Sequence, residues 1–179
     1  MTLAGDATVM AGSGTVFLTA VACAFALGAC GSPGSRWSEL TRRPDIDEAV
    51  ARYGELTNEI AGALSAKFGL PPWETADDRD PGCADFPEAA PGDALTSTRT
   101  SSTPARIPPD QWPRAAITVE RTASAHGFTI DDLGSRSVSF HDAYAAKLTV
   151  DATSESTTIR VRTGCHLLPE AKQRASRAP

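Results

Sequence analysis

The sequence lacks several patterns that mark common classes of activity. No Gly-rich phosphate loop follows the first 30 residues, and no Gly-x-Ser-x-Gly elbow occurs anywhere. No internal repeat is visible. No apolar run reaches the roughly 20 residues that a transmembrane helix needs. Nothing in the residue pattern therefore points to a P-loop nucleotide-binding site, an α/β-hydrolase, a repeat architecture or a membrane-spanning domain.

Positive charge is also scarce. Lys and Arg number 17 against 22 Asp and Glu, which gives a formal net charge of −5. The missing basic footprint argues against nucleic acid as a partner. Residues 1–16 contain no Lys or Arg at all, and Asp6 is acidic. This beginning departs from a secretory signal, which normally starts with a positive charge.

The apolar run that does exist ends in a processing signal. Thr15 to Ala29 carries no charge, and Leu27-Gly28-Ala29-Cys30 reads as a bacterial lipobox. We expect residues 1–29 to be a lipoprotein signal peptide, Cys30 to be lipidated, and residues 30–44 to be a flexible tether. More than one acyl chain gives a stable anchor, which predicts the outer face of the plasma membrane. An uncleaved anchor and plain secretion remain the alternatives.

The four cysteines divide by position. Cys23 lies in the signal peptide and Cys30 is the lipidation site, so Cys83 and Cys165 remain in the exported domain. A disulfide between them is the default in an oxidising compartment. It would close a loop of about 80 residues and stabilise the domain by roughly 4–5 kcal/mol. Two separate buried thiols are the alternative.

Two amphipathic helices are expected. The first begins near Asp45 or Asp47, carries apolar residues at helical spacing to Phe68, and ends at Gly69. The second follows a Pro-Pro-Asp segment, begins at Trp112 and ends at His126-Gly127.

Alternating residues predict a β-meander. Its strands are expected at Phe128 to Leu133, around Val138 and Phe140 as far as Tyr144, at Leu148 and Val150, and from Ile159 to Cys165. The segment Thr96 to Thr103 fits an edge strand or a loop. We expect the acids at 77–80 to lie in an exposed, solvated turn. Their spacing does not match the ligand pattern of an EF-hand calcium loop.

These elements predict an α+β fold. Two amphipathic helices would pack on one face of an antiparallel β-meander as a two-layer sandwich. The domain would span residues 45–168, and the polar tail at 169–179 would be disordered.

The candidate catalytic residues are scattered. His126, His141 and His166 do not have the spacing of metal ligands, and we expect no metal and no cofactor. His141-Asp142 and Cys165-His166 are neighbours on strands and should point to opposite faces. A Ser-His-Asp triad assembled in space stays open. Three tryptophans, Trp37, Trp73 and Trp112, are interpreted as core packing or as a ligand groove, with Trp37 in the tether.

Several of these features together resemble the LppA-type lipoproteins of actinobacteria. They are Cys30, the helix with Tyr53, Leu56 and Ile60, Trp73 and the acidic run before Cys83, the helix Trp112 to Gly127, and the closing Thr163-Gly164-Cys165-His166-Leu167-Leu168. The resemblance covers roughly Pro44 to Leu168. It implies an exported, lipid-anchored envelope protein with a paired cysteine and no established enzymatic activity, so no catalytic residue carries over.

The sequence therefore predicts a non-enzymatic lipoprotein whose domain binds an envelope protein or a small ligand. One alternative is a lipid or glycolipid carrier with an apolar cavity between the helices and the sheet. A second alternative is an envelope hydrolase. A large apolar cavity would favour the carrier, and a cleft with converging polar side chains would favour the enzyme.

Overall fold

The computed structural model describes residues 33–177 of the chain. Four helices and seven strands follow one another in this part. They are α1 Pro33–Arg42, α2 Ile46–Phe68, β1 Glu74–Asp80, β2 Ala94–Thr103, α3 Trp112–Ala125, β3 Thr129–Leu133, β4 Ser137–His141, β5 Lys147–Ala152, β6 Thr157–Arg162, β7 His166–Leu167 and α4 Pro169–Arg177. The predicted signal peptide and the lipobox cysteine Cys30 lie outside the described residues.

The long helix α2 has sequence signals at both ends. The Asp45 carboxylate accepts hydrogen bonds from the amides of Asp47 and Glu48, and Glu48 returns a bond to the Asp45 amide, which completes a capping box. Gly69 ends the helix in the left-handed conformation, with φ of 66°. The prediction of this helix is confirmed to within a residue or two at its start.

The strands form one antiparallel sheet in the order β1-β2-β6-β5-β4-β3, and the short β7 pairs with β2. The predicted meander is confirmed as β3 to β6. The segment Thr96 to Thr103 forms a strand, as one of the two interpretations had it. It is not an edge strand, because β2 lies between β1 and β6.

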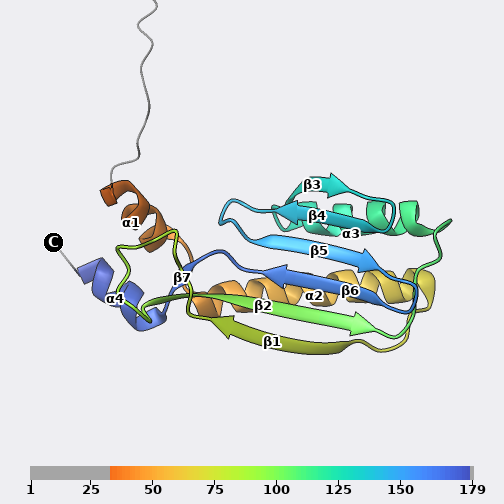
Figure 1. Ribbon diagram of the computed structural model, residues 1–179, viewed down its shortest axis with the longest axis horizontal. Coiled ribbons are helices and arrows are strands. Elements are labelled where there is room, and N and C mark those ends of the chain that lie inside the picture. The colour runs from red at the N-terminus through yellow and green to blue at the C-terminus, as the bar shows by residue number, and fades with distance from the viewer. Residues whose placement is uncertain (1–32, 178–179) are drawn as a thin grey trace, which may run out of the picture. The chain divides into compact units, whose positions relative to one another are not determined.

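Helices α2 and α3 pack on one face of this sheet, as Figure 1 shows. Alternate strand residues point toward the helices and are buried, among them Val138, Phe140, Leu148, Val150 and Ile159. The remaining residues of β4, β5 and β6 point to the other face, which we call the open face, and are half-buried or exposed. This arrangement confirms the α+β class, with helices on one face of an antiparallel sheet.

A second, smaller core lies beside β7. Leu40 of α1, Leu167 of β7 and Ala171 of α4 are buried there with Phe86 and Cys165. The expected tether is wrong over α1, and the expected disordered tail is wrong over α4. Both segments are short and polar overall, so they had no strong helical pattern in the sequence. They are helical because each places one or two apolar residues on this second core.

The acidic run is a strand and not the expected turn. All seven residues of β1 are exposed, and they pair along their whole length with β2. An edge strand needs no apolar residues, because the ladder hydrogen bonds hold it and its charges discourage further pairing. Its acids neutralise arginines: Asp77 pairs with Arg99 and Asp80 lies near Arg162. This pairing explains the acids without a calcium ion.

None of the described helices is long and apolar enough to cross a membrane. Within residues 33–177, no three His, Cys, Asp or Glu side chains gather as a metal site would require.

Candidate functional site

A disulfide joins Cys83 and Cys165 at the end of the sheet where β6 stops. Their Cα atoms are 5.7 Å apart, and 82 residues separate them along the chain. The expected strand from Ile159 to Cys165 is too long, because β6 ends at Arg162. Cys165 therefore lies in the second core and not in the main one. The disulfide fixes the loop Pro81 to Phe86 against this corner of the sheet.

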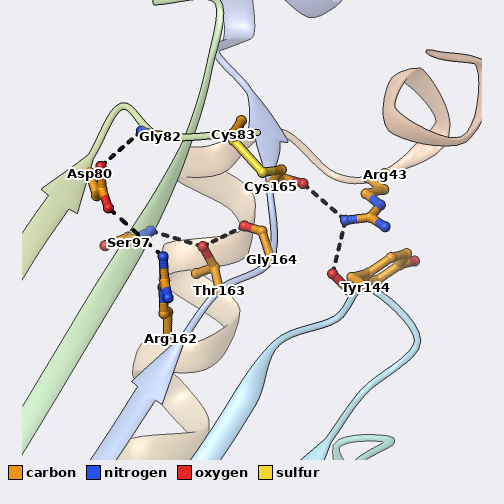
Figure 2. The surroundings of a disulfide bond; sticks show 10 residues. All are labelled: Arg43, Asp80, Gly82, Cys83, Ser97, Tyr144, Arg162, Thr163, Gly164 and Cys165. Carbon is orange, nitrogen blue, oxygen red and sulfur yellow. Dashed lines mark hydrogen bonds and ion pairs between the residues drawn. A yellow bond between two sulfur atoms is a disulfide. The ribbon is translucent and has the colours of Figure 1, made fainter. Parts of the chain in front are cut away.

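Arg43 contacts several segments that meet at the same corner of the sheet. Its Nη1 donates hydrogen bonds to the carbonyl oxygens of Tyr144 and Cys165, 2.9 and 3.1 Å away. Its Nη2 pairs with Glu39, and its guanidinium lies 5.0 Å from the centre of the Phe86 ring. Arg43 itself is only 6% exposed. A single buried cation thus ties α1, the β4–β5 loop and the disulfide into one unit (Figure 2).

Gly164 lets these segments approach one another. A Cβ atom at this position would collide with the carbonyl oxygen of Tyr144 and crowd the Arg43 guanidinium. Next to it, the Thr163 hydroxyl accepts a hydrogen bond from the Ser97 amide and donates one to the Gly164 carbonyl. Only glycine fits here, because backbone from the β4–β5 loop occupies the space of a side chain.

A cleft of about 490 Å³ opens between this corner and the loop fixed by the disulfide. We call it the disulfide cleft. It is lined by Arg43, Gly82, Ala84, Asp85, Phe86, Thr96, Ala145, Lys147, Arg162, Thr163, Gly164 and Cys165. Three of these side chains are cationic and one is acidic. The cleft therefore has a surplus of positive charge in a chain that is acidic overall.

Two buried polar atoms in residues of the cleft lining have no hydrogen-bond partner within residues 33–177. They are the hydroxyl of Thr96 and the Nε of Arg43, and their residues are 5% and 6% exposed. Buried polar groups are nearly always paired, because an unpaired one loses its hydration without compensation. Two such unpaired atoms in residues that line one cleft indicate a place where a polar molecule binds.

A buried network lies beside the cleft. The Tyr53 hydroxyl donates to Asp142, whose other oxygen accepts from the amides of Tyr144 and Ala146. Burial, and then the hydrogen bond to Asp142, raise the pKa of Tyr53 above its usual range. The Tyr53 hydroxyl therefore stays protonated and remains a donor. The network shapes the β4–β5 loop, which forms one wall of the cleft.

His166 is buried close to this network. Its Nδ1 lies 2.9 Å from the carbonyl oxygen of Pro44, and its Nε2 has no hydrogen-bond partner in the described part of the chain. Burial lowers the pKa of His166 below its ordinary value of 6.5, against the opposing effect of the bond to Pro44. The ring is therefore neutral near pH 7, with the Nδ1 proton donated to Pro44.

The other histidines each have a separate carboxylate partner. His126 lies 2.9 Å from Glu59, and His141 lies 2.5 Å from Asp131. His141 is exposed at the end of β4, and Asp142 is buried in the loop that follows, so the expectation that both lie on a strand is wrong. Asp142 pairs with Tyr53 and not with His141, so this candidate pair is not brought together.

The tryptophans serve packing. Trp112 is buried in the main core and Trp73 packs at its edge, which confirms the packing interpretation for both. Trp37 is partly buried against the second core and lies in α1. It is therefore part of the folded domain and not of a tether.

An apolar groove of about 300 Å³ runs between α3 and β3. It contains the three large hydrophobic side chains that are exposed among the described residues: Ile117, Ile130 and Leu133. The groove is the main apolar feature on the described surface.

Sequence reasoning missed the residues of the disulfide cleft. Arg160 and Arg162 alternate with apolar residues on the exposed face of β6, and this pattern alone assigns them no role. Arg43 belonged to the expected tether, and Thr96 was one of many hydroxyl residues. The only available signal was the cysteine pair, which marks where distant segments meet.

Comparisons with known proteins support the fold. The LppA family, described as "Lipoprotein confined to pathogenic Mycobacterium", matches residues 35–169. A crystal structure of LppA from Mycobacterium tuberculosis is 15% identical, covers 79% of this chain and 86% of that chain, and has a TM-score of 0.51. A DUF4853 family protein from Actinomyces odontolyticus is 14% identical, with 72% of each chain covered and a TM-score of 0.45. A search of curated proteins finds no match.

Proposed function

Because the chain belongs to the LppA family of lipoproteins, we propose that it is anchored to the cell envelope through lipid on Cys30 and displays a non-enzymatic domain that binds a small envelope ligand. The lipid holds the protein at the outer face of the plasma membrane, so the folded domain needs no membrane-binding surface of its own. Its surface is then free for another contact.

The disulfide cleft is the observation that carries the binding role. It combines a concave surface, converging cations and two buried polar atoms without partners. Specific small-molecule sites have this composition, because a few placed polar groups orient the ligand inside a cleft. The disulfide and Arg43 hold the walls in place before a ligand arrives, which reduces the entropy lost on binding.

The two alternatives have less support. A lipid carrier needs an apolar cavity between the helices and the sheet, and this space holds the packed side chains of the main core. A hydrolase of the Ser-His-Asp type needs a histidine bonded to a nucleophilic hydroxyl. Within residues 33–177, the histidine rings bond to Glu59, Asp131 and the carbonyl oxygen of Pro44, and none bonds to a hydroxyl.

The anchor is tested by feeding a labelled fatty acid to an actinobacterial host that expresses the full chain. Wild-type protein should carry the label, and Cys30→Ala should not. Cys23→Ala is the matched control, because that cysteine lies in the predicted signal peptide and should leave labelling intact. Persistent labelling of Cys30→Ala would contradict the anchor.

The binding role is tested by native mass spectrometry of the protein released from the envelope in mild detergent. Wild-type protein should carry an added small-molecule mass that is reduced in Thr96→Val, a substitution that removes the hydroxyl and keeps the shape. Thr98→Val, at a half-buried position two residues along β2, is the control. Equal spectra for all three proteins would contradict ligand binding in the cleft.

A further inference from the structure

We propose that the disulfide cleft recognises a phosphate group. This inference rests on the proposed binding function and names the chemistry of its ligand. The ligand is an oxyanion of the phosphate monoester or diester type, contacted by Lys147, Arg162 and Thr96. Its source is either a soluble phosphorylated molecule or the headgroup of a membrane lipid.

The two cations of the site lie side by side on neighbouring strands. Lys147 of β5 and Arg162 of β6 are direct partners in the antiparallel register, and both point to the open face. Like charges in this position destabilise a sheet unless an anion lies near them. Lys147 has no ion pair among residues 33–177, and Arg162 reaches Asp80 only at 3.8 Å, with both side chains more than half exposed. An exposed pair at this distance contributes little.

Thr96 adds a third donor from another strand. It lies on β2 two residues before Thr98, which is the register partner of Arg162, so its side chain belongs to the same face. Thr96 is nevertheless buried, and it is one of the residues that line the cleft. Its hydroxyl has no hydrogen-bond partner among the residues that the structure describes. A ligand oxygen in the cleft would supply that partner.

The arrangement of donors favours phosphate over carboxylate. The ammonium, the guanidinium and the hydroxyl come from three adjacent strands, β5, β6 and β2, and converge on one cleft. A tetrahedral oxyanion presents oxygens in three directions, and a planar carboxylate presents two. Arginine and lysine are also the usual cationic partners of phosphate. Two acids oppose this assignment by charge: Asp85 at the cleft lining, and Asp80, which lies 3.8 Å from Arg162.

The test is isothermal titration of the full acylated protein in phosphatidylcholine nanodiscs at constant ionic strength. The probes are inorganic phosphate, glycerol 3-phosphate and neutral glycerol. We expect both phosphates to bind and glycerol not to bind. Arg162→Ala, Lys147→Ala and Thr96→Val should each weaken phosphate binding, the two charge deletions by about tenfold or more.

Arg160→Ala is the matched control. Arg160 lies on the same strand and face as Arg162, two residues away, but does not line the disulfide cleft. Arg160→Ala removes the same charge from the sheet as Arg162→Ala. An equal loss of phosphate affinity in the two variants would show a general charge effect and overturn the site. Absence of phosphate binding would also overturn it.

The source of the phosphate is distinguished by lipid composition. If a membrane headgroup is the ligand, phosphatidylglycerol nanodiscs should compete and weaken the binding of free glycerol 3-phosphate. If the ligand is soluble, the affinity should be the same in both kinds of nanodisc. Either result supports a phosphate site. Binding of glycerol as tight as that of glycerol 3-phosphate would overturn the phosphate inference and leave the binding function standing.

Discussion

The hydroxyl oxygen of Tyr53 lies 2.5 Å from a carboxylate oxygen of Asp142, and both side chains are buried. This bond joins α2 to the loop between β4 and β5. The other oxygen of Asp142 accepts hydrogen bonds from the amides of Tyr144 and Ala146, so the carboxylate fixes the path of that loop. The carbonyl oxygen of Tyr144 in turn accepts a hydrogen bond from the Arg43 guanidinium at the disulfide cleft. The core and the candidate site are therefore connected through one buried carboxylate.

Removing the Tyr53 hydroxyl should destabilise the domain. Tyr53→Phe leaves a buried carboxylate oxygen without its donor, and we expect the free energy of unfolding to fall by about 1–3 kcal/mol in urea titrations. Tyr144→Phe is the control, because its ring is half-buried and its hydroxyl makes no hydrogen bond within residues 33–177. Equal losses in the two variants would contradict the role of the Tyr53–Asp142 bond.

The buried His166 should make the domain sensitive to acid. Its pKa is lowered in the folded state, so the unfolded chain binds a proton more readily below the ordinary pKa of 6.5. The neutral, buried His166 ring therefore contributes its full stabilisation above pH 6.5. As the pH falls from 6.5 toward the pKa of the folded state, the free energy of unfolding should decrease by up to about 1.4 kcal/mol per pH unit.

Unfolding in urea at a series of pH values from 7.5 to 5 measures this loss. His166→Gln should be less stable at pH 7.5 and should show a shallower decline. A wild-type slope in His166→Gln would show that other groups cause the acid sensitivity.

Gly164 should not tolerate a side chain. Gly164→Ala places a methyl group against the Tyr144 carbonyl oxygen, which belongs to backbone and cannot rotate away. We expect the free energy of unfolding to fall by about 1–3 kcal/mol or more, as at other overpacked sites. Gly62→Ala is the opposite control, because Gly62 lies exposed in α2 with open space around it. That substitution should stabilise the domain by about 1 kcal/mol.

The disulfide should contribute to stability through the loop it closes. Replacing both Cys83 and Cys165 by serine should lower the free energy of unfolding by about 4–5 kcal/mol, since 82 residues separate the two cysteines. Thermal unfolding of the oxidised protein, the reduced protein and the double variant measures this. Equal stability of the oxidised and reduced proteins would contradict the prediction.

The main layers of the fold could be predicted because their residues follow a local period. Val138 and Phe140, and likewise Leu148 and Val150, alternate between core and open face, and α2 repeats its apolar residues every three or four positions. These patterns arise because each element buries one side against the core. The apolar residues therefore recur at a fixed spacing within the segment itself.

The missed elements have no such period. Strand β1 is entirely exposed and is held by pairing with β2, so its sequence reads as a polar turn. Helices α1 and α4 are short and contribute Leu40 and Ala171 to a core that long-range contacts assemble. The disulfide cleft depends on the register of β2, β5 and β6 together. The pairing register of strands that are distant in the sequence cannot be predicted from any one of those segments.

Hydrogen–deuterium exchange with and without glycerol 3-phosphate tests the cleft most directly. The amides at residues 94–98, 145–148 and 162–165 surround the disulfide cleft, and those at 129–133 in β3 lie at the far edge of the sheet. Our account predicts slower exchange in the first three segments when the ligand is present, no change in β3, and loss of the effect in Arg162→Ala. Unchanged exchange around the cleft, or equal slowing in β3, would contradict it.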